Sequence, residues 1–203
     1  MLKINVLQNY LQAGRLEAGC DEAGRGSLAG PVYAAAVILP ADFNHPELND
    51  SKQLSEAKRN ELRIYIEQYA LCFAVAAASR EEIDKLNILN ASILAMHRAL
   101  QALTSKPDFI LVDGNRFKPY KDIPHRCVIR GDSTFTSIAA ASILAKTYRD
   151  EYMMGIADEY PEYGWHENKG YATKIHREAV LRLGLSPHHR KTFNIKDMQL
   201  KLF

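Results

Sequence analysis

The hydrophobic positions of the chain fall into short runs that are separated by polar turns rich in glycine, asparagine, aspartate and proline. A continuous apolar run of about four to eight residues between turn signals is typical of a buried strand. Strands are therefore expected over residues 16–20, 32–39, 71–78, 109–112 and 127–132.

Apolar residues at helical spacing, preceded by residues that cap helices, predict the remaining elements. Each predicted helix begins behind a serine, asparagine or threonine, except one that is rich in alanine and serine and suited to close packing on a sheet. The predicted helices begin after Ser55, after Ser79 in a capping box with Glu82, after Asn90 for 91–103, at 134–149 with continuation to about 160, and after Thr173 for 174–183, which Gly184 ends.

Length and composition bound the class of protein. The chain has 203 residues, of which 47% are hydrophobic, which suffices for one substantial core with a short appended helical piece. A formal net charge of +2 neither requires nor excludes nucleic acid as a partner. We expect a catalytic domain over 1–160 and a substrate-contacting loop, helix and tail over 161–203 that pack on it.

Cysteine usage and the apolar runs predict a cytoplasmic protein. Cys20, Cys72 and Cys127 are odd in number, far apart and set in apolar segments, so we interpret them as reduced packing residues. The apolar runs are shorter than the roughly 20 residues that span a bilayer. The first ten residues lack the pattern of a secretory signal.

Two adjacent carboxylates, Asp21 and Glu22, end the first predicted strand and lead into the turn Gly24-Arg25-Gly26. Neighbouring side chains on a strand point to opposite faces, so burying both charges is unfavourable unless a cation or hydrogen bonds compensate them. Glycines in the turn permit a positive φ or close approach to a ligand, and backbone N–H groups there can meet a hydroxyl or a phosphate. A tight hairpin with water-exposed acids explains these residues equally well.

Two further acids follow predicted strands, Asp113 before Gly114 and Asp132 after Gly131. Asp-Gly is also an ordinary turn signal, so either acid alone is weak evidence. Three strand ends that carry acids and converge nevertheless favour a shared site. An oxygen-only cluster without histidine or cysteine suits Mg²⁺ or Mn²⁺ better than zinc.

Three other polar segments allow both a binding and a structural interpretation. Asp50, Ser51 and Lys52 precede a predicted helix start, where an anion is favoured, but a solvated turn is also consistent with them. An aromatic loop formed by Tyr163, Trp165, Lys169 and Tyr171 could stack on bases or sugars while its lysine meets phosphate, or could be held to the surface by its aromatic side chains.

The histidines near the C-terminus, His176, His188 and His189, have no cysteine or acid at ligand spacing. Phosphate contact or plain solvation is therefore expected for them rather than zinc binding.

The order of these motifs resembles that of the bacterial ribonuclease HII family over about residues 16–193. No single motif is specific, but their succession is. The resemblance rests on Asp21 to Gly26 with Gly30-Pro31, Asp50 to Leu54, Val112 to Gly114, Gly131-Asp132, Ala140 to Lys146 with Arg149-Asp150, Lys169 to Tyr171 with Thr173 and His176, and His189-Arg190 with Phe193.

The resemblance implies a ribonuclease H-like α/β fold, a mixed sheet flanked by helices with a small helical C-terminal extension. It also implies the site residues. Asp21, Glu22, Asp113 and Asp132 correspond to catalytic carboxylates that bind two Mg²⁺ or Mn²⁺ ions; Gly24, Arg25 and Gly26 to a loop that senses the ribose 2′-hydroxyl; Tyr171 to a tyrosine at the RNA–DNA junction; and Ser51 and Lys52 to phosphate contacts.

By the same resemblance, the chain is expected to be a monomeric endonuclease acting in ribonucleotide removal. It would cut the RNA strand of RNA/DNA hybrids and the 5′ side of single ribonucleotides in duplex DNA, leaving 5′-phosphate and 3′-hydroxyl ends. Two positions depart from the family pattern: Asn168 stands where histidine is frequent, and Ala172 where glycine is common. These departures bear on the junction loop rather than on hydrolysis.

The last five residues are similar to the short peptide by which bacterial replication proteins bind the sliding clamp. Gln199 and Leu200 precede Lys201, and Leu202 and Phe203 could enter an apolar pocket. A frayed end that packs on its own domain is the alternative.

Two other functions remain open at this stage. A DNA nuclease or recombinase of the same fold would share the acidic cluster but need no 2′-hydroxyl sensor. A non-catalytic module that binds hybrids would need no complete set of acids, whereas all four are present here.

Overall fold

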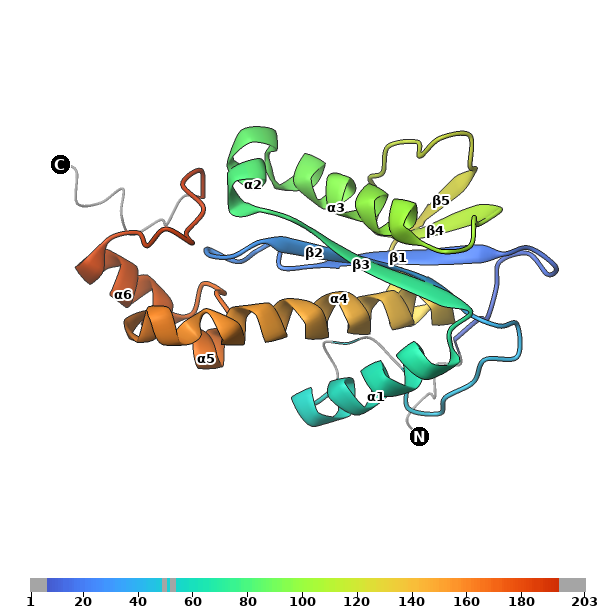
Figure 1. Ribbon diagram of the computed structural model, residues 1–203, viewed down its shortest axis with the longest axis horizontal. Helices are drawn as coiled ribbons and strands as arrows, with labels where there is room; N and C mark the ends of the chain where they lie inside the picture. Colours follow the sequence, from blue (N-terminus) through green and yellow to red (C-terminus); the bar gives the residue numbers. More distant parts are fainter. Residues whose placement is uncertain (1–6, 49–50, 52–53, 194–203) are drawn as a thin grey trace.

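The computed structural model describes residues 7–48, 51 and 54–193, and it contains one five-stranded mixed sheet with helices on both faces (Figure 1). The elements in chain order are β1 (Glu17–Ala23), β2 (Val32–Ile38), α1 (Glu56–Tyr69), β3 (Cys72–Ala78), α2 (Arg80–Leu86), α3 (Ile88–Ala102), β4 (Phe109–Asp113), β5 (His125–Val128), η2 (Gly131–Ser133), α4 (Thr136–Gly155), η3 (Ala157–Glu159), η4 (Pro161–Tyr163), α5 (Trp165–Asn168) and α6 (Lys174–Leu183).

The strands lie in the order β3-β2-β1-β4-β5, so β1 is central. β1 pairs antiparallel with β2 and parallel with β4, while β2 and β3 pair antiparallel and β4 and β5 parallel. No helix in the described part of the chain is long and apolar enough to cross a membrane. The mixed sheet flanked by helices confirms the α/β class expected from the sequence.

Strand residues alternate between two cores because successive side chains point to opposite faces. One core joins Ala18 and Cys20 of β1 to α3, and the other joins Ala23 of β1 and the odd-numbered residues of β2 to α4 and α1. In Figure 1, α2 and α3 lie on one side of the sheet, and α4 lies between the sheet and α1 on the other.

Helix α4 lies unusually close to the central strand. A Cβ atom at Gly19 of β1 would overlap the backbone of Ser137 and Ile138, so glycine at this position permits the contact. The buried alanines of α4 are equally small. Close packing brings side chains of α4 to the same face of β1 as residue 21.

The predicted caps at Ser55, Ser79 and Thr173 are confirmed, including the capping box between Ser79 and Glu82. The predicted cap at Asn90 is wrong, because α3 begins at Ile88 behind Asn87. Asn87 has a φ of 67°, which asparagine tolerates, and its side chain accepts the Asn90 N–H at 3.1 Å. The three cysteines are free, as expected.

The expected strand at 127–132 is shorter than predicted. β5 is an edge strand paired only with β4 among the described strands, and the last pair in their register is Asp113 with Val128. Beyond that pair no neighbouring strand remains, and Arg130 adopts a left-handed conformation. Asp132 therefore lies in the short helix η2 rather than at a strand end.

The C-terminal segment packs on the end of α4 through its aromatic residues. Trp165 is fully buried and Tyr163 nearly so, in a cluster with Leu28 and Met153. Lys169 is also buried, and its ammonium donates to the His166 carbonyl. Of the two interpretations of this loop, the structure therefore favours the structural one for Tyr163, Trp165 and Lys169, because these side chains are buried within the segment.

Two buried histidines connect the turns of this segment. The Ser186 N–H lies 2.9 Å from Nδ1 of His189, and the two Nε2 atoms of His189 and His176 lie 3.0 Å apart. Nε2 of His176 also accepts the Trp165 indole N–H, and its Nδ1 lies 2.9 Å from the Tyr171 carbonyl. Neutral rings, protonated on Nδ1 of His176 and Nε2 of His189, satisfy every contact. The expected solvation or phosphate contact is wrong for both.

These histidines predict a loss of stability in acid. Burial lowers the pKa of His176, and burial with the neighbouring histidines lowers the pKa of His189 to about 4. The unfolded chain takes up protons below its ordinary histidine pKa of about 6.5, whereas the folded chain does not until a lower pH. Stability is thus retained at neutral pH and lost as pH falls from about 6.5 towards 4.

Urea unfolding at pH 7 and pH 4.5 measures this effect. Between pH 7 and pH 4.5, the free energy of unfolding of the wild-type chain should fall by about 2 kcal/mol more than that of His189→Gln, because the variant has one titrating imidazole fewer. Replacing the exposed His166 by glutamine should leave the wild-type loss unchanged. Equal losses in wild type and His189→Gln would contradict a neutral buried pair.

Candidate active site

Three of the four predicted acids lie towards the carboxyl ends of the paired parallel strands β1 and β4. The parallel register of β1 and β4 pairs Cys20 with Val112, which places Asp21 beside Asp113 at the next step along both strands. Asp21, Glu22 and Asp113 line one cleft of about 280 Å³. The other residues that line it are Ala23, Gly24, Arg25, Gly26, Ser51, Ser142, Lys146 and Tyr171.

Asp21 is the most constrained of these acids, because it is 4% exposed and faces α4. Its Oδ1 accepts the Glu22 N–H at 2.7 Å, and Ser142 of α4 also hydrogen-bonds to the carboxyl. Burial, followed by the negative charges of Glu22 and Asp113, raises its pKa well above the usual range. A buried carboxylate beside like charges is stabilised by a bound cation.

Asp132 is brought to this region by a hydrogen bond between its neighbour Gly131 and Asp113, and not by strand pairing. Oδ1 of Asp113 accepts the Gly131 N–H at 2.7 Å, and this bond holds η2 against the end of β4. Asp132 is the next residue and is nearly buried. Among the described residues it does not line the cleft, but the bond from its neighbour Gly131 to Asp113 brings this part of the chain to the end of β4.

The donor set fits a hard divalent cation, since it contains carboxylate oxygens and serine hydroxyls. The predicted acids do not form a compact group of ligand atoms in the described part of the chain. The three ligand atoms that do lie within 4.8 Å of one another belong to His45, Glu47 and Glu61. Mutual repulsion of carboxylates opposes such closeness, and Glu22 instead pairs with Arg25 at 3.0 Å.

The compact group at His45 is a poorer candidate. Nζ of Lys58 lies 2.7 Å from Glu47 and 2.8 Å from Glu61, so an ammonium already neutralises both carboxylates. Both glutamates are also exposed.

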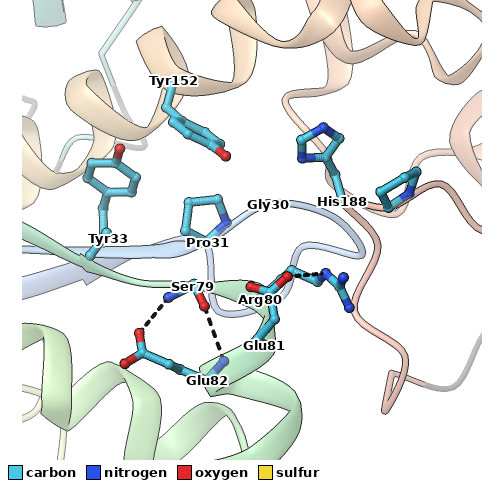
Figure 2. Close-up of a pocket in the computed structure, with 11 residues that line it drawn as sticks. Gly30, Pro31, Tyr33, Ser79, Arg80, Glu81, Glu82, Tyr152 and His188 are labelled. Atoms are coloured by element: carbon cyan, nitrogen blue, oxygen red, sulfur yellow. Dashed lines mark hydrogen bonds and ion pairs between the residues drawn. The ribbon is translucent and has the colours of Figure 1, made fainter.

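The larger cavity, about 510 Å³, lies beyond the Gly30-Pro31 end of the β1–β2 connection (Figure 2). Its acids are engaged with neighbouring residues. Glu82 accepts the Ser79 N–H at 2.9 Å and binds Arg98 at 2.6 Å, and Glu81 pairs with Arg80 at 2.9 Å. None of the residues predicted for the site lines this cavity.

The glycine loop and Tyr171 line the same cleft as the acids. Gly24 has a φ of +96°, and a Cβ there would overlap the Arg149 guanidinium, so both its conformation and its contact require glycine. Tyr171 pairs with Ser27 in a bridge, and its ring lies 5.1 Å from Nζ of Lys146 and 4.9 Å from Cζ of Arg149.

Asn168, one of the departures from the family pattern, supports Tyr171. Its Oδ1 accepts the Gly170 N–H at 2.8 Å, its backbone carbonyl accepts the Tyr171 N–H at 2.8 Å, and its Nδ2 donates to the Tyr163 carbonyl at 2.7 Å. Asparagine therefore holds the junction loop through three local hydrogen bonds.

Of the predicted phosphate contacts, Ser51 lies in the cleft and its Oγ is 2.8 Å from Oγ of Ser142. Lys52 lies outside the described residues, as do the tail positions Gln199, Leu200, Leu202 and Phe203.

Sequence reasoning assigned no site role to Ser142, Lys146, Arg149 and Arg190. Ser142, Lys146 and Arg149 stand four and three residues apart, so one face of α4 presents all three towards the cleft and its loop. Polar residues at this spacing in an otherwise alanine-rich helix were the available signal. Arg190 stood in one of the motifs that carry the family resemblance, but its contacts with residues 24–31 are formed only by folding.

Comparisons with known proteins show the family of the chain and agree with its fold. The family model described as Ribonuclease HII matches residues 18–196. A ribonuclease HII of Parabacteroides distasonis is 61% identical over 197 residues, covering 97% of this chain and 99% of the relative.

Two archaeal structures share the fold. Ribonuclease H2 from Pyrococcus horikoshii has a TM-score of 0.74 at 25% identity, covering 88% of this chain and 93% of the other. The PCNA:RNase HII complex from Archaeoglobus fulgidus also gives 0.74, at 24% identity, over 93% of this chain and 100% of the matched chain.

Neutralising Asp21 should stabilise the chain in a chelator while removing its response to metal. At pH 8 in EDTA, Asp21→Asn should melt about 2–4 °C above wild type, because a buried like charge is lost. Adding Mn²⁺ or Mg²⁺ should raise the melting temperature of wild type but not of the variant. Calorimetry measures both effects.

Asp158→Asn is the matched control, since Asp158 is exposed and remote from the cleft. It should melt and respond to metal as wild type does. A wild-type melting temperature that is indifferent to both ions would contradict a metal site at Asp21.

Proposed function

The chain belongs to the ribonuclease HII family, and we propose that it is a metal-dependent endoribonuclease that cuts RNA strands in RNA/DNA hybrids and the 5′ side of single ribonucleotides in duplex DNA. Its products would carry 5′-phosphate and 3′-hydroxyl ends, and its role would be ribonucleotide removal in DNA repair. Family membership makes it a ribonuclease H; the substrate details and ends are the proposal.

The observation that carries the proposal is the cleft itself. Buried Asp21, with Glu22 and Asp113, lines one cavity together with the glycine loop and Tyr171. Acids that need a cation therefore lie next to backbone groups and an aromatic ring suited to a nucleotide. This combination favours a nuclease that examines the sugar at the site of cleavage.

Asp21, Glu22, Asp113 and Asp132 would hold two Mg²⁺ or Mn²⁺ ions. When bound, such ions supply Lewis-acid activation of water and charge neutralisation at the scissile phosphate. In hydrolysis, the oxygen of a water molecule would bond to phosphorus and the bond from phosphorus to the 3′ oxygen would break. A proton from that water would end on the 3′ oxygen, which leaves as a hydroxyl.

The remaining cleft residues would bind and orient the substrate. Backbone N–H groups of Gly24 to Gly26 would meet the 2′-hydroxyl, Tyr171 would lie against the sugar at the RNA–DNA junction, and Ser51 and Lys52 would contact the phosphate backbone. Arg25, which is half-exposed and paired with Glu22, adds positive charge at the rim.

A DNA nuclease or recombinase of related fold and a non-catalytic hybrid-binding module are the alternatives. The first has no use for a loop that senses a 2′-hydroxyl. A non-catalytic module would gain nothing from buried Asp21, whose negative charge is made unfavourable by the carboxylates of Glu22 and Asp113. The buried acid therefore favours an enzyme, and the proposed contact of the loop with a 2′-hydroxyl would make that enzyme a ribonuclease.

A duplex with one embedded ribonucleotide tests the proposal. With Mg²⁺ or Mn²⁺, wild type should make one cut 5′ of that ribonucleotide, whereas the all-DNA duplex should stay intact. Asp21→Asn should bind the duplex but lose turnover by about three orders of magnitude or more. Tyr171→Ala should cut it less selectively. Product mapping on sequencing gels, with metal added and withheld, reports all three.

Cutting the all-DNA duplex equally well would indicate a DNA nuclease, and binding without metal-dependent cleavage would indicate a binding module. Asp158→Asn should cleave as wild type does, which separates the loss in Asp21→Asn from a general effect of removing a carboxylate.

We also propose that the C-terminal tail binds the bacterial sliding clamp through Gln199, Leu200, Leu202 and Phe203. Two apolar residues at the chain end suit a hydrophobic pocket. One structural neighbour is a ribonuclease HII in complex with PCNA.

Surface plasmon resonance with the immobilised clamp of the same bacterium tests the tail. Replacing Leu202 and Phe203 by alanine should weaken binding by more than about tenfold, because hydrophobic anchors dominate such contacts. Lys201→Ala is the matched control and should change it little. Cleavage of a short duplex should be equal in all three proteins; unchanged clamp binding in the double variant would exclude the tail.

A further inference from the structure

Two arginines lie buried behind the loop that joins β1 to β2. Arg149 of α4 is 0% exposed and Arg190 of the C-terminal segment is 1% exposed. Buried guanidinium groups normally pair with carboxylates. Here most of their hydrogen bonds go instead to backbone carbonyls of residues 24–31.

Arg190 binds both ends of the loop. Its Nη2 donates to the carbonyls of Gly24 at 2.7 Å and Pro31 at 3.2 Å, its Nη1 to that of Arg25 at 3.0 Å, and its Nε to that of Gly30 at 2.9 Å. Four carbonyls thus converge on one planar group. A lysine has no fork of donors that could reach the same set.

Arg149 supports the same loop from α4. Its Nη2 donates to Oγ of Ser27 at 2.7 Å and to the Ala29 carbonyl at 3.3 Å, and its Nε lies 3.3 Å from the Pro31 carbonyl. Its side chain occupies the space where a Cβ of Gly24 would lie.

The contacts of Arg190 determine which loop groups face the cleft. In a planar trans peptide, the carbonyl of one residue and the N–H of the next point in opposite directions. Because Arg190 holds the carbonyls of Gly24 and Arg25, the N–H groups of Arg25 and Gly26 point away from it. Both residues line the acid cleft. Neither N–H donates a hydrogen bond within the described part of the chain.

Burying two cations together is unfavourable, and burial with the charge of Arg149 lowers the pKa of Arg190. A role limited to packing could be filled by an apolar side chain without that penalty. The converging carbonyl dipoles offset the penalty, and they do so only while the loop keeps this conformation.

We propose that Arg190, supported by Arg149, is a positioning residue that holds the backbone donors of Arg25 and Gly26 towards the ribose, so that selectivity for a ribonucleotide depends on it. The inference rests on the proposed function, in which this loop meets the 2′-hydroxyl. Arg190 itself lies behind the loop and acts through it.

The test compares two dissociation constants, whose ratio is independent of the active fraction of the protein. Binding to a duplex with one ribonucleotide and to the same all-DNA duplex is measured with Ca²⁺ in place of Mg²⁺. Wild type should prefer the ribonucleotide by about tenfold, the range of one or two hydrogen bonds. Arg190→Lys should reduce this ratio to near one while affinity for the all-DNA duplex stays within about twofold.

Arg98→Lys is the matched control, since Arg98 also donates to a carbonyl, that of Ala77 at 2.9 Å, and pairs with Glu82 away from the cleft. It should keep the wild-type ratio. A wild-type ratio near one would contradict 2′-hydroxyl sensing itself, whereas a clear wild-type preference that Arg190→Lys retains would overturn the inference alone.

Thermal unfolding shows whether Arg190→Lys is folded at the assay temperature. Should it not be, Ser27→Ala replaces it, because that change removes one Arg149 hydrogen bond to the loop and empties little space. Its ratio should fall about threefold. An unchanged ratio in Ser27→Ala would then overturn the positioning role.

Discussion

Electrostatic repulsion among Asp21, Glu22 and Asp113 is the constraint on which the rest of the site depends. The parallel pairing of β1 with β4 brings two of these carboxyls to adjacent strand positions, and close packing of α4 buries one of them. The resulting charge density is unfavourable in the chain alone and is relieved by a divalent cation. The fold therefore holds an arrangement of charges that a bound cation would stabilise.

The C-terminal segment contributes Tyr171 to the cleft and packs against the loop that joins β1 to β2. Residues 170–171 and 188–190 flank the loop of residues 27–30 through backbone hydrogen bonds, among them Leu28 N–H to the Gly170 carbonyl and Gly30 N–H to the His188 carbonyl. The histidine pair fixes this segment internally, and Arg190 fixes the loop from behind. Segments from both ends of the chain are thus joined around the cleft by buried polar groups.

Local signals in the sequence were sufficient for most elements, because caps and apolar spacing act within a few residues. The capping box at Ser79, the cap at Thr173 and the end of the last helix at Gly184 are cases in which neighbouring residues satisfy the backbone. Asn87 and Asn90 could both cap a helix, and the choice between them depended on the left-handed turn between α2 and α3. The end of β5 depended on where its partner β4 stops.

By itself, the sequence determined the class of fold and most helix caps, and it predicted the four acids, since these follow from residue type and from motifs in a recognisable order. Tertiary structure alone decided that Trp165, Lys169, His176 and His189 are internal, that Asp132 approaches through Asp113, and that Arg190 lies behind the glycine loop. The physical reason is that burial and hydrogen-bond partners are properties of contacts between distant segments, and a polar residue looks the same in the sequence whether it faces a substrate or a backbone carbonyl 160 positions away.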